Sequence, residues 1–211
     1  MDYATQLWLF FALVFAVVIL PGLDMAFVLA SALTGGRRSG LAAVAGLVAA
    51  GGCHVLAGAL GIGMLMKVMP AAFNAVLLVG AVYVAWIGWS LLRSRGGFGA
   101  VDDIASRSLW ATFRQAALTN LLNPKAYMFM LAVFPQFLRT EFGAIAPQAV
   151  VLGVIIAATQ AGVYGAIALV AADARGWLQS RPAAGLVVNR GVGVVLIAAA
   201  AITGLQGWRM L

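Results

Sequence analysis

Charged side chains are scarce in this sequence, and long apolar runs dominate it. Of the 211 residues, 9% are charged and 64% are hydrophobic, whereas an average soluble domain is about a quarter charged and about 45–50% apolar. A chain of this composition folded in water has too little polar surface to cover its core. The shortage of charge therefore excludes an ordinary soluble enzyme and a disordered protein, and it indicates a polytopic membrane protein.

The chain also lacks the residues of common catalytic and metal sites. Cys53 is the only cysteine and His54 the only histidine, so no internal disulfide can form and these two alone cannot build a zinc or haem site. No Gly-Lys-Ser or Gly-Lys-Thr phosphate loop occurs. We therefore expect no enzymatic activity, no metal and no cofactor. The net charge of +7 comes from basic residues scattered between apolar runs, which is typical of membrane loops rather than of a nucleic-acid surface.

Six apolar runs are long enough to cross a bilayer, for which a helix needs about 20 residues. They cover about residues 4–34, 40–66, 71–92, 109–138, 147–172 and 185–206. All six must be helical, because lipid offers no hydrogen-bond partner to an unpaired backbone. The sequence therefore predicts an all-α fold with a single membrane domain over residues 1–211. Its two halves, about 1–95 and 109–211, are joined by a loop at about 93–108.

Lysine and arginine are distributed unevenly between the two predicted membrane faces. The gaps after the first, third and fifth runs hold nine of them, and the opposite face holds three. Basic loops stay in the cytoplasm. We therefore predict that both termini lie outside and that the central loop is cytoplasmic.

Two charged residues fall inside apolar runs, and each follows a proline. Asp24 lies three residues after Pro21, and Lys125 directly follows Pro124. A proline removes one helical donor and blocks the carbonyl four residues earlier, so we expect helix breaks at Pro21-Gly22 and at Pro124. A charge at this depth costs at least about 2.5–3.5 kcal/mol against lipid. Asp24 and Lys125 should therefore face protein, water or each other.

The two breaks occupy corresponding positions in the two halves. Aligning Pro21 with Pro124 also places Met25 on Met128. Each half holds three runs, and because this number is odd the halves have opposite orientations. Broken helices at matching positions of inverted repeats indicate the midplane site of a transporter.

Polar residues in the second and fifth runs extend this picture. His54 and Gln160 lie near the centres of these runs, and together with Asp24 and Lys125 they predict a polar locus shared by four helices. Each residue also has a purely structural interpretation. Asp24 and Lys125 would then form an ion pair, and His54 and Gln160 would be hydrogen-bond partners between helices.

Three stretches of the sequence are similar to the LysE-type amino-acid exporter family, which includes the lysine, homoserine and threonine exporters. They are Pro21-Gly22-Leu23-Asp24, Gly36-Arg37-Arg38-Ser39-Gly40, and the stretch from Thr119 to Ala126 with its continuation to Phe137. The family usually reads Pro-Gly-Pro at the first break, where this chain has Leu23. The resemblance implies a multi-pass protein that exports amino acids or similar small metabolites across a bacterial inner membrane, driven by the proton gradient.

These observations lead to a hypothesis for the site. The substrate is a small zwitterion, whose ammonium group is held by Asp24 and whose carboxylate is held by Lys125 with nearby amides. The other predicted substrate-binding residues are Thr119, Asn120, Asn123, His54 and Gln160. Proton coupling requires a group that titrates during the cycle. Asp24 is the first candidate, because desolvation disfavours its charged form, and His54 is the second.

Two other functions stay open at the level of the sequence. A permease for an inorganic cation would use Asp24 and His54 as ligands, although Lys125 repels a cation. A non-transporting membrane subunit would bind its partners through small-residue faces such as Gly191 and Gly193. Glycine-rich and alanine-rich faces also permit a homodimer.

Overall fold

The structure is a computed structural model that describes residues 2–60 and 108–181 continuously. It also describes residues 78, 81–82, 85–86, 88–89, 92–93, 183–184, 186–187, 190–191, 193–194, 197–198, 200–201 and 205. Every regular element in this described part is helical, which confirms the all-α class. Most of the loop at 93–108 and of the predicted spans at 71–92 and 185–206 lies outside the described residues. Those residues of the two spans that are described are helical.

The first predicted span is interrupted at its proline. Helix α1 covers Tyr3–Ile19, and α2 begins at Leu23 after its N-cap, Gly22. Pro21 has no amide hydrogen to offer to the carbonyl of Val17, so the hydrogen-bond ladder of α1 ends here. The break that the Pro-Gly pair predicts is therefore present.

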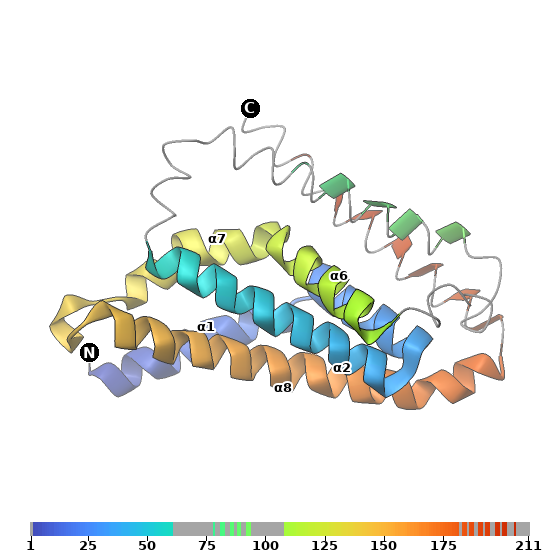
Figure 1. Cartoon of the computed structure of the whole chain (residues 1–211), viewed down its shortest axis with the longest axis horizontal. Coiled ribbons are helices and arrows are strands. Elements are labelled where there is room, and N and C mark those ends of the chain that lie inside the picture. The colour runs from blue at the N-terminus through green and yellow to red at the C-terminus, as the bar shows by residue number, and fades with distance from the viewer. Residues whose placement is uncertain are drawn as a thin grey trace.

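Helix α2, Leu23–Ala59, consists of two antiparallel arms rather than one long rod (Figure 1). Gly36, inside it, has φ 73° and ψ −166°, a left-handed conformation that glycine adopts without strain. Gly40 packs on Ala32, because a Cβ built on Gly40 would lie 2.8 Å from the Ala32 Cβ. In a straight helix these two residues would be about 12 Å apart. The first arm therefore completes the first predicted span, and the second arm forms most of the second.

The fourth predicted span is also interrupted at its proline. Helix α6 covers Leu109–Leu121, and α7 covers Pro124–Ala132. Asn123 caps α7, since its side-chain oxygen accepts the Lys125 amide at 3.0 Å. Pro124 occupies the first position of α7, where no amide donor is needed. The Asn-Pro pair thus ends one helix and starts the next.

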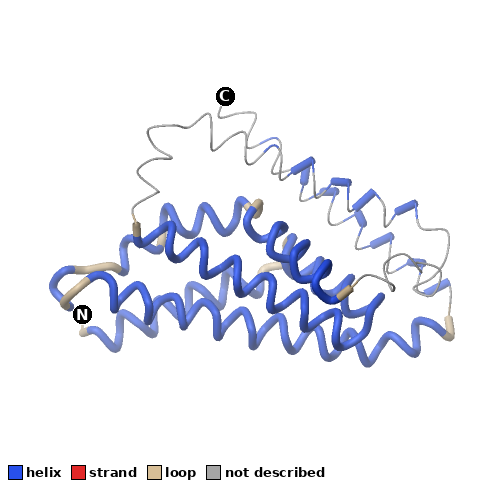
Figure 2. Tube along the Cα trace, in the orientation of Figure 1, coloured by secondary structure: helices blue, strands red, loops and turns tan. Residues whose placement is uncertain are grey.

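Helix α8, Ile145–Gln179, follows two short 3₁₀ helices, η1 (Phe134–Phe137) and η2 (Thr140–Phe142). Helix α2 packs on both α8 and α6 (Figures 1 and 2). Gly46 brings the second arm of α2 close to α6, since a Cβ at Gly46 would collide with the carbonyl of Phe113. Helix α2 therefore lies at the centre of the described bundle.

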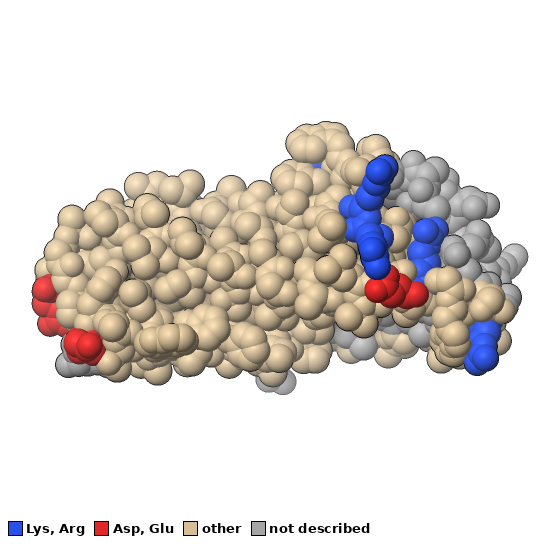
Figure 3. Space-filling view, turned by 90° about the horizontal axis from the view of Figure 1, so that it is seen from below, with Lys and Arg blue, Asp and Glu red and all other residues tan. Residues whose placement is uncertain are grey.

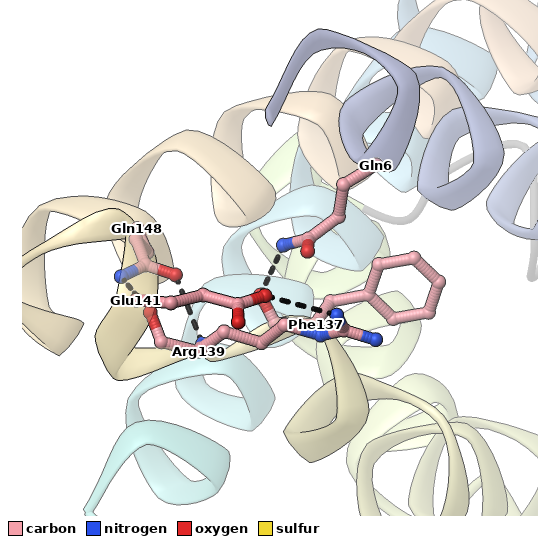
Figure 4. A network of polar contacts seen from close by, with 5 residues as sticks. All are labelled: Gln6, Phe137, Arg139, Glu141 and Gln148. Carbon is pink, nitrogen blue, oxygen red and sulfur yellow. Dashed lines mark hydrogen bonds and ion pairs between the residues drawn. The ribbon is translucent and has the colours of Figure 1, made fainter. Parts of the chain in front are cut away.

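Side-chain amides fix the connection between α7 and α8 (Figure 4). The Gln148 amide donates to the carbonyl oxygens of Arg139 at 2.8 Å and Gly143 at 3.0 Å, and its oxygen accepts the Arg139 amide at 3.1 Å. From α1, the Gln6 amide donates to the Phe137 carbonyl at 2.8 Å. The connection is thereby tied to both α1 and α8.

Some polar side chains are buried while many large apolar side chains face outwards. Asp24 and several amide and hydroxyl side chains are buried, whereas Trp8, Leu60 and Val170 are 71%, 77% and 71% exposed. Figure 3 shows charged residues near the two ends of the molecule, with an uncharged stretch between them. In the described part, the helix Ile145–Trp177 is long and apolar enough to cross a membrane, and the segment Leu23–Ala59, which meets the same criteria, is divided into its two arms at Gly36. These features are those of a membrane protein.

Candidate functional site

A cavity lies where the two helix breaks face each other. Its lining comes from α1, α2, α6, α7 and α8. The polar side chains of the lining are Asp24, His54, Asn120, Lys125, Gln160 and Tyr164, and the apolar ones include Val14, Phe129, Met130 and Ile156. The structure therefore brings the four polar residues predicted near the middle of their spans to one cavity.

Asp24 lies in the first turn of α2 and is 3% exposed. Its Oδ2 accepts a hydrogen bond from the Asn120 side-chain amide at 3.0 Å, while its Oδ1 is buried without a hydrogen-bond partner. The N-terminal end of a helix favours a negative charge, and Lys125 and His54 lie close enough to interact electrostatically with this carboxylate. Thus Asn120 fixes one oxygen of Asp24 by a hydrogen bond, and the Asn123 side-chain amide also lies close enough to interact with this carboxylate.

The Lys125 ammonium completes the broken end of α1. Its Nζ donates to the carbonyl oxygens of Val17 at 3.1 Å and Leu20 at 3.2 Å. Val17 lies four positions before Pro21, so its carbonyl has lost its helical donor. The C-terminal end of a helix also attracts positive charge. Gly22 leaves room for this contact, because a Cβ there would lie 3.3 Å from the Lys125 Nζ.

His54 makes the corresponding contact at the second break. Its Nε2 lies 3.1 Å from the carbonyl oxygen of Asn120, which is four positions before Pro124 and also accepts the Asn123 amide at 2.9 Å. Since a carbonyl oxygen only accepts, Nε2 carries the proton. The imidazole packs edge-on against the Tyr127 ring, with centroids 4.8 Å apart. Each half of the chain thus supplies a side chain to the break in the other half.

The two charges of the cavity do not form a direct ion pair. Among the described residues, the ion pairs within 4.0 Å are Arg37–Asp173 and Arg139–Glu141. Lys125 binds backbone carbonyls and Asp24 binds an amide. Asp24 and Lys125 therefore line one cavity and interact electrostatically without a direct contact within 4.0 Å.

Tyr164 is a cavity residue that the sequence analysis did not single out. It lies one turn after Gln160 on α8, is 1% exposed and interacts electrostatically with Asp24. Its spacing of four residues from Gln160 is the signal that places both on one helix face. Gln160 is 7% exposed and its Oε1 has no hydrogen-bond partner. This oxygen packs against Gly51, where a Cβ would lie 2.8 Å from it.

Thr119 and Asn123 are buried beside the cavity, outside its lining as the described residues define it. The Thr119 hydroxyl donates to the Gln115 carbonyl of its own helix at 2.8 Å. Asn123 caps α7, and its amide nitrogen is buried without a hydrogen-bond partner. Asn120 does line the cavity and contacts Asp24 directly.

Comparison with known proteins places the chain among membrane proteins and transporters. Residues 15–207 match the LysE type translocator family. An uncharacterized membrane protein of Vibrio cholerae is 34% identical over 71% of this chain and 73% of that protein. A homoserine/homoserine lactone efflux protein of Salmonella typhimurium is 31% identical over 64% of this chain and 65% of that protein. A leucine efflux protein of Klebsiella pneumoniae is 29% identical over 58% of each chain.

No solved structure matches this chain. The family match nevertheless includes both helix breaks and every described residue of the cavity except Val14. Translocators and efflux proteins are not enzymes, so membership of this family confirms the expectation that the chain has no enzymatic activity. The chain belongs to the LysE type translocator family, as the motifs around its two prolines predicted.

Proposed function

We propose that this protein exports amino acids across a bacterial inner membrane. In this proposal the chain crosses the bilayer six times, in two inverted halves of three helices, and the substrate binds between the two helix breaks. The observation that supports this proposal most directly is that Asp24 and Lys125 line the same cavity. One buried oxygen of Asp24 has no hydrogen-bond partner among the described residues. A cavity with one group of each charge suits a zwitterion. The efflux of homoserine and of leucine named for two relatives supports the same substrate class.

The acceptors in the cavity suit the ammonium group of an amino acid. Among the described residues that line the cavity, three have a buried side-chain oxygen without a hydrogen-bond partner, namely Asp24 Oδ1, Asn120 Oδ1 and Gln160 Oε1. Buried acceptors are normally paired, and an ammonium group has three N–H donors to offer. Asp24 supplies the negative charge, while the side-chain oxygens of Asn120 and Gln160 orient the ammonium group.

The donors suit the carboxylate. The ammonium of Lys125 has three N–H groups, and Val17 and Leu20 accept two of them. The third is left for the substrate carboxylate. The side-chain amide of Asn123, one residue before Pro124, lies beside the cavity at the second break and interacts with the Asp24 carboxylate. Lys125 therefore both completes α1 and binds substrate.

The cavity in this structure is too small to hold an amino acid. The cavity has a volume of about 60 Å³, whereas a cavity that holds benzene measures about 150 Å³. One turn before Val14 on α1, Phe10 is fully buried, and its ring centroid lies 5.8 Å from Phe129 and 5.0 Å from Phe137. Phe129 lines the cavity, and the Phe10 and Phe137 rings lie between it and the end of the molecule that holds Gln148. Export requires the halves to rock apart so that this layer opens.

The exchange of substrate for a proton centres on Asp24. The end of the molecule with Arg37 and Arg175 faces the cytoplasm, because basic residues are retained there. Asp24 binds the ammonium group from the cytoplasm, releases it outside and takes up a proton in its place. The proton then leaves to the cytoplasm when the cavity faces inwards. One amino acid thus moves out as one proton moves in.

Counterflow into proteoliposomes tests the proposal directly. We expect the purified protein to exchange amino acids across the membrane. An imposed proton gradient should increase the rate of this exchange. The variant Asp24→Asn should lose exchange by more than about 30-fold, because truncating a buried charge contact costs at least about 2 kcal/mol. Asp2→Asn is the matched control: Asp2 only caps α1, through a 3.3 Å hydrogen bond from the Thr5 amide, which Asn can replace.

The same assay separates the competing functions. Exchange of metal ions but not of amino acids would show a cation permease, and the absence of any exchange would show a non-transporting subunit. Normal amino-acid exchange by Asp24→Asn would overturn the role of this carboxylate. A proton gradient without effect on the rate would overturn the coupling and leave the amino-acid exchange standing.

A further inference from the structure

The cavity is polar at one end and apolar at the other. Helix α8 begins at the end of the molecule that holds Gln148, and Ile156, Gln160 and Tyr164 line the cavity at intervals of one turn. Ile156 is therefore nearer to that end than the two polar residues. Gln160 and Tyr164 lie at the depth of the breaks, where Tyr164 interacts with Asp24.

Three other apolar residues of the lining, Val14, Phe129 and Met130, lie on the same side as Ile156, whereas Val17, Val18 and Ala126 lie next to the breaks. Helix α1 runs from the Gln148 end towards its break, so Val14 lies between that end and Pro21. Helix α7 runs from its break back towards the same end, so Phe129 and Met130 lie about one turn beyond Lys125. Val14, Phe129, Met130 and Ile156 thus form an apolar subsite next to the charged groups.

Among the described residues, this subsite offers no acidic partner to a second positive charge. Within the described lining of the cavity, the acidic and basic residues are Asp24 and Lys125, and both lie at the breaks. Val14 is 2% exposed, and Met130 and Ile156 are each 8% exposed. An ammonium or guanidinium group placed among them would lose its water without gaining a carboxylate.

We infer that this transporter selects neutral amino acids with aliphatic side chains and rejects lysine and arginine. The inference rests on the proposed function, because Asp24 and Lys125 must hold the amino acid by its backbone charges. With the ammonium group at Asp24, the side chain extends into the apolar subsite. Ile156 and Val14 are the specificity-determining residues, and the flexible Met130 adapts the wall to branched or straight chains.

The apolar character of the subsite sets the expected selectivity. One methylene group in a hydrophobic pocket changes specificity by about 10- to 200-fold. Leucine should therefore be exported with a transport efficiency at least about tenfold above that of alanine. Lysine carries an unpaired charge into the subsite, and we expect its exchange at background level.

Substrate ratios measured on two variants test the inference. Ile156→Ala and Val14→Ala should lower the leucine-to-alanine ratio of counterflow rates by about tenfold or more each, because each shortens the wall around the aliphatic side chain. A ratio is used since partial unfolding reduces both rates equally and leaves it unchanged. Val170→Ala, on the same helix as Ile156 but 71% exposed, is the control and should keep the wild-type ratio.

The outcomes distinguish this inference from the proposed function. If the wild type exchanges lysine as fast as leucine, or if both variants keep the wild-type ratio, the apolar subsite does not set specificity. If Asp24→Asn loses all exchange while either of these results is also found, the apolar subsite is excluded but the proposal of amino-acid export still holds. Absence of amino-acid exchange by the wild type would instead overturn the proposed function itself.

Discussion

The Nζ of Lys125 lies 3.1 Å from the carbonyl oxygen of Val17, the acceptor that Pro21 leaves without a helical donor. At the other break, Nε2 of His54 lies 3.1 Å from the carbonyl oxygen of Asn120. Lys125 belongs to the second half of the chain and His54 to the first. The contacts are therefore reciprocal, and in the proposed cycle both break when the halves separate.

The first prediction concerns the stability that Lys125 gives to the empty protein. We expect Lys125→Met to lower the free energy of unfolding by about 1 kcal/mol, because it leaves the part-buried carbonyl of Val17 without a donor. Thermal unfolding in detergent without substrate measures this change. A residue that served only to bind substrate would leave the unfolding temperature unaltered.

A second substitution makes this prediction specific. Pro21→Ala restores an amide that can donate to the Val17 carbonyl, so Lys125→Met should cost less in that background than in the wild type. The difference between the two costs is the coupling energy of a double-mutant cycle. Equal costs in both backgrounds would show that Lys125 stabilises the protein by some other contact.

Some of this site could be predicted from the sequence, because proline acts locally. Pro21 and Pro124 remove a donor wherever the helices pack, so the positions of both breaks follow from the chain alone. Asp24 and Lys125 were predicted as site residues because a charge in an apolar run has few tolerable environments. The similarity to the LysE family rested on the same stretches and is confirmed.

The partners of these groups could not be predicted, because they depend on packing between distant segments. Nothing in the sequence indicates that Lys125 contacts Val17, or that Asn120 rather than Lys125 binds the Asp24 carboxylate. Tyr164 was not predicted as a site residue, because an apolar run does not indicate which of its aromatic residues face inwards. Thr119 matches the family motif, yet its hydroxyl donates to its own helix.

The second prediction concerns His54, whose observed contact needs an N–H donor and no change of charge. His54→Gln keeps a donor, so we expect it to retain substantial amino-acid exchange with the pH dependence of the wild type. His54→Ala leaves the Asn120 carbonyl with one donor fewer and should slow exchange without moving the pH profile. Rates measured across the neutral range of pH check both variants. A shifted profile in His54→Gln would instead assign the coupling proton to His54.

The third prediction tests the close approach of α2 and α6. A Cβ on Gly46 would collide with the Phe113 carbonyl and lie 2.9 Å from the Ala116 Cβ. We expect Gly46→Ala to destabilise the protein by about 1–3 kcal/mol, as overpacking does. Unfolding temperatures in detergent measure the change.

Gly52→Ala provides the matched control on the same arm of α2. A Cβ there meets nothing within 4 Å, so the helix should gain the stability that alanine confers over glycine, about 0.4–1 kcal/mol. If both substitutions destabilise the protein equally, the contact between this arm of α2 and α6 is not the reason that the arm does not tolerate added side chains.

The fourth prediction concerns the connection between α7 and α8, which covers the aromatic layer at the end away from Arg37. The Gln148 side chain bonds both the amide and the carbonyl of Arg139 and the carbonyl of Gly143. Gln148→Leu removes these partners at nearly constant volume, so we expect the connection to open more often and trypsin to cleave faster after the exposed Arg139. Glu141→Gln is the control, because it breaks only the exposed ion pair between Arg139 and Glu141, and such pairs contribute little. Equal cleavage rates in the two variants would show that Gln148 does not hold this end of the molecule closed, and that the aromatic layer around Phe10 does so alone.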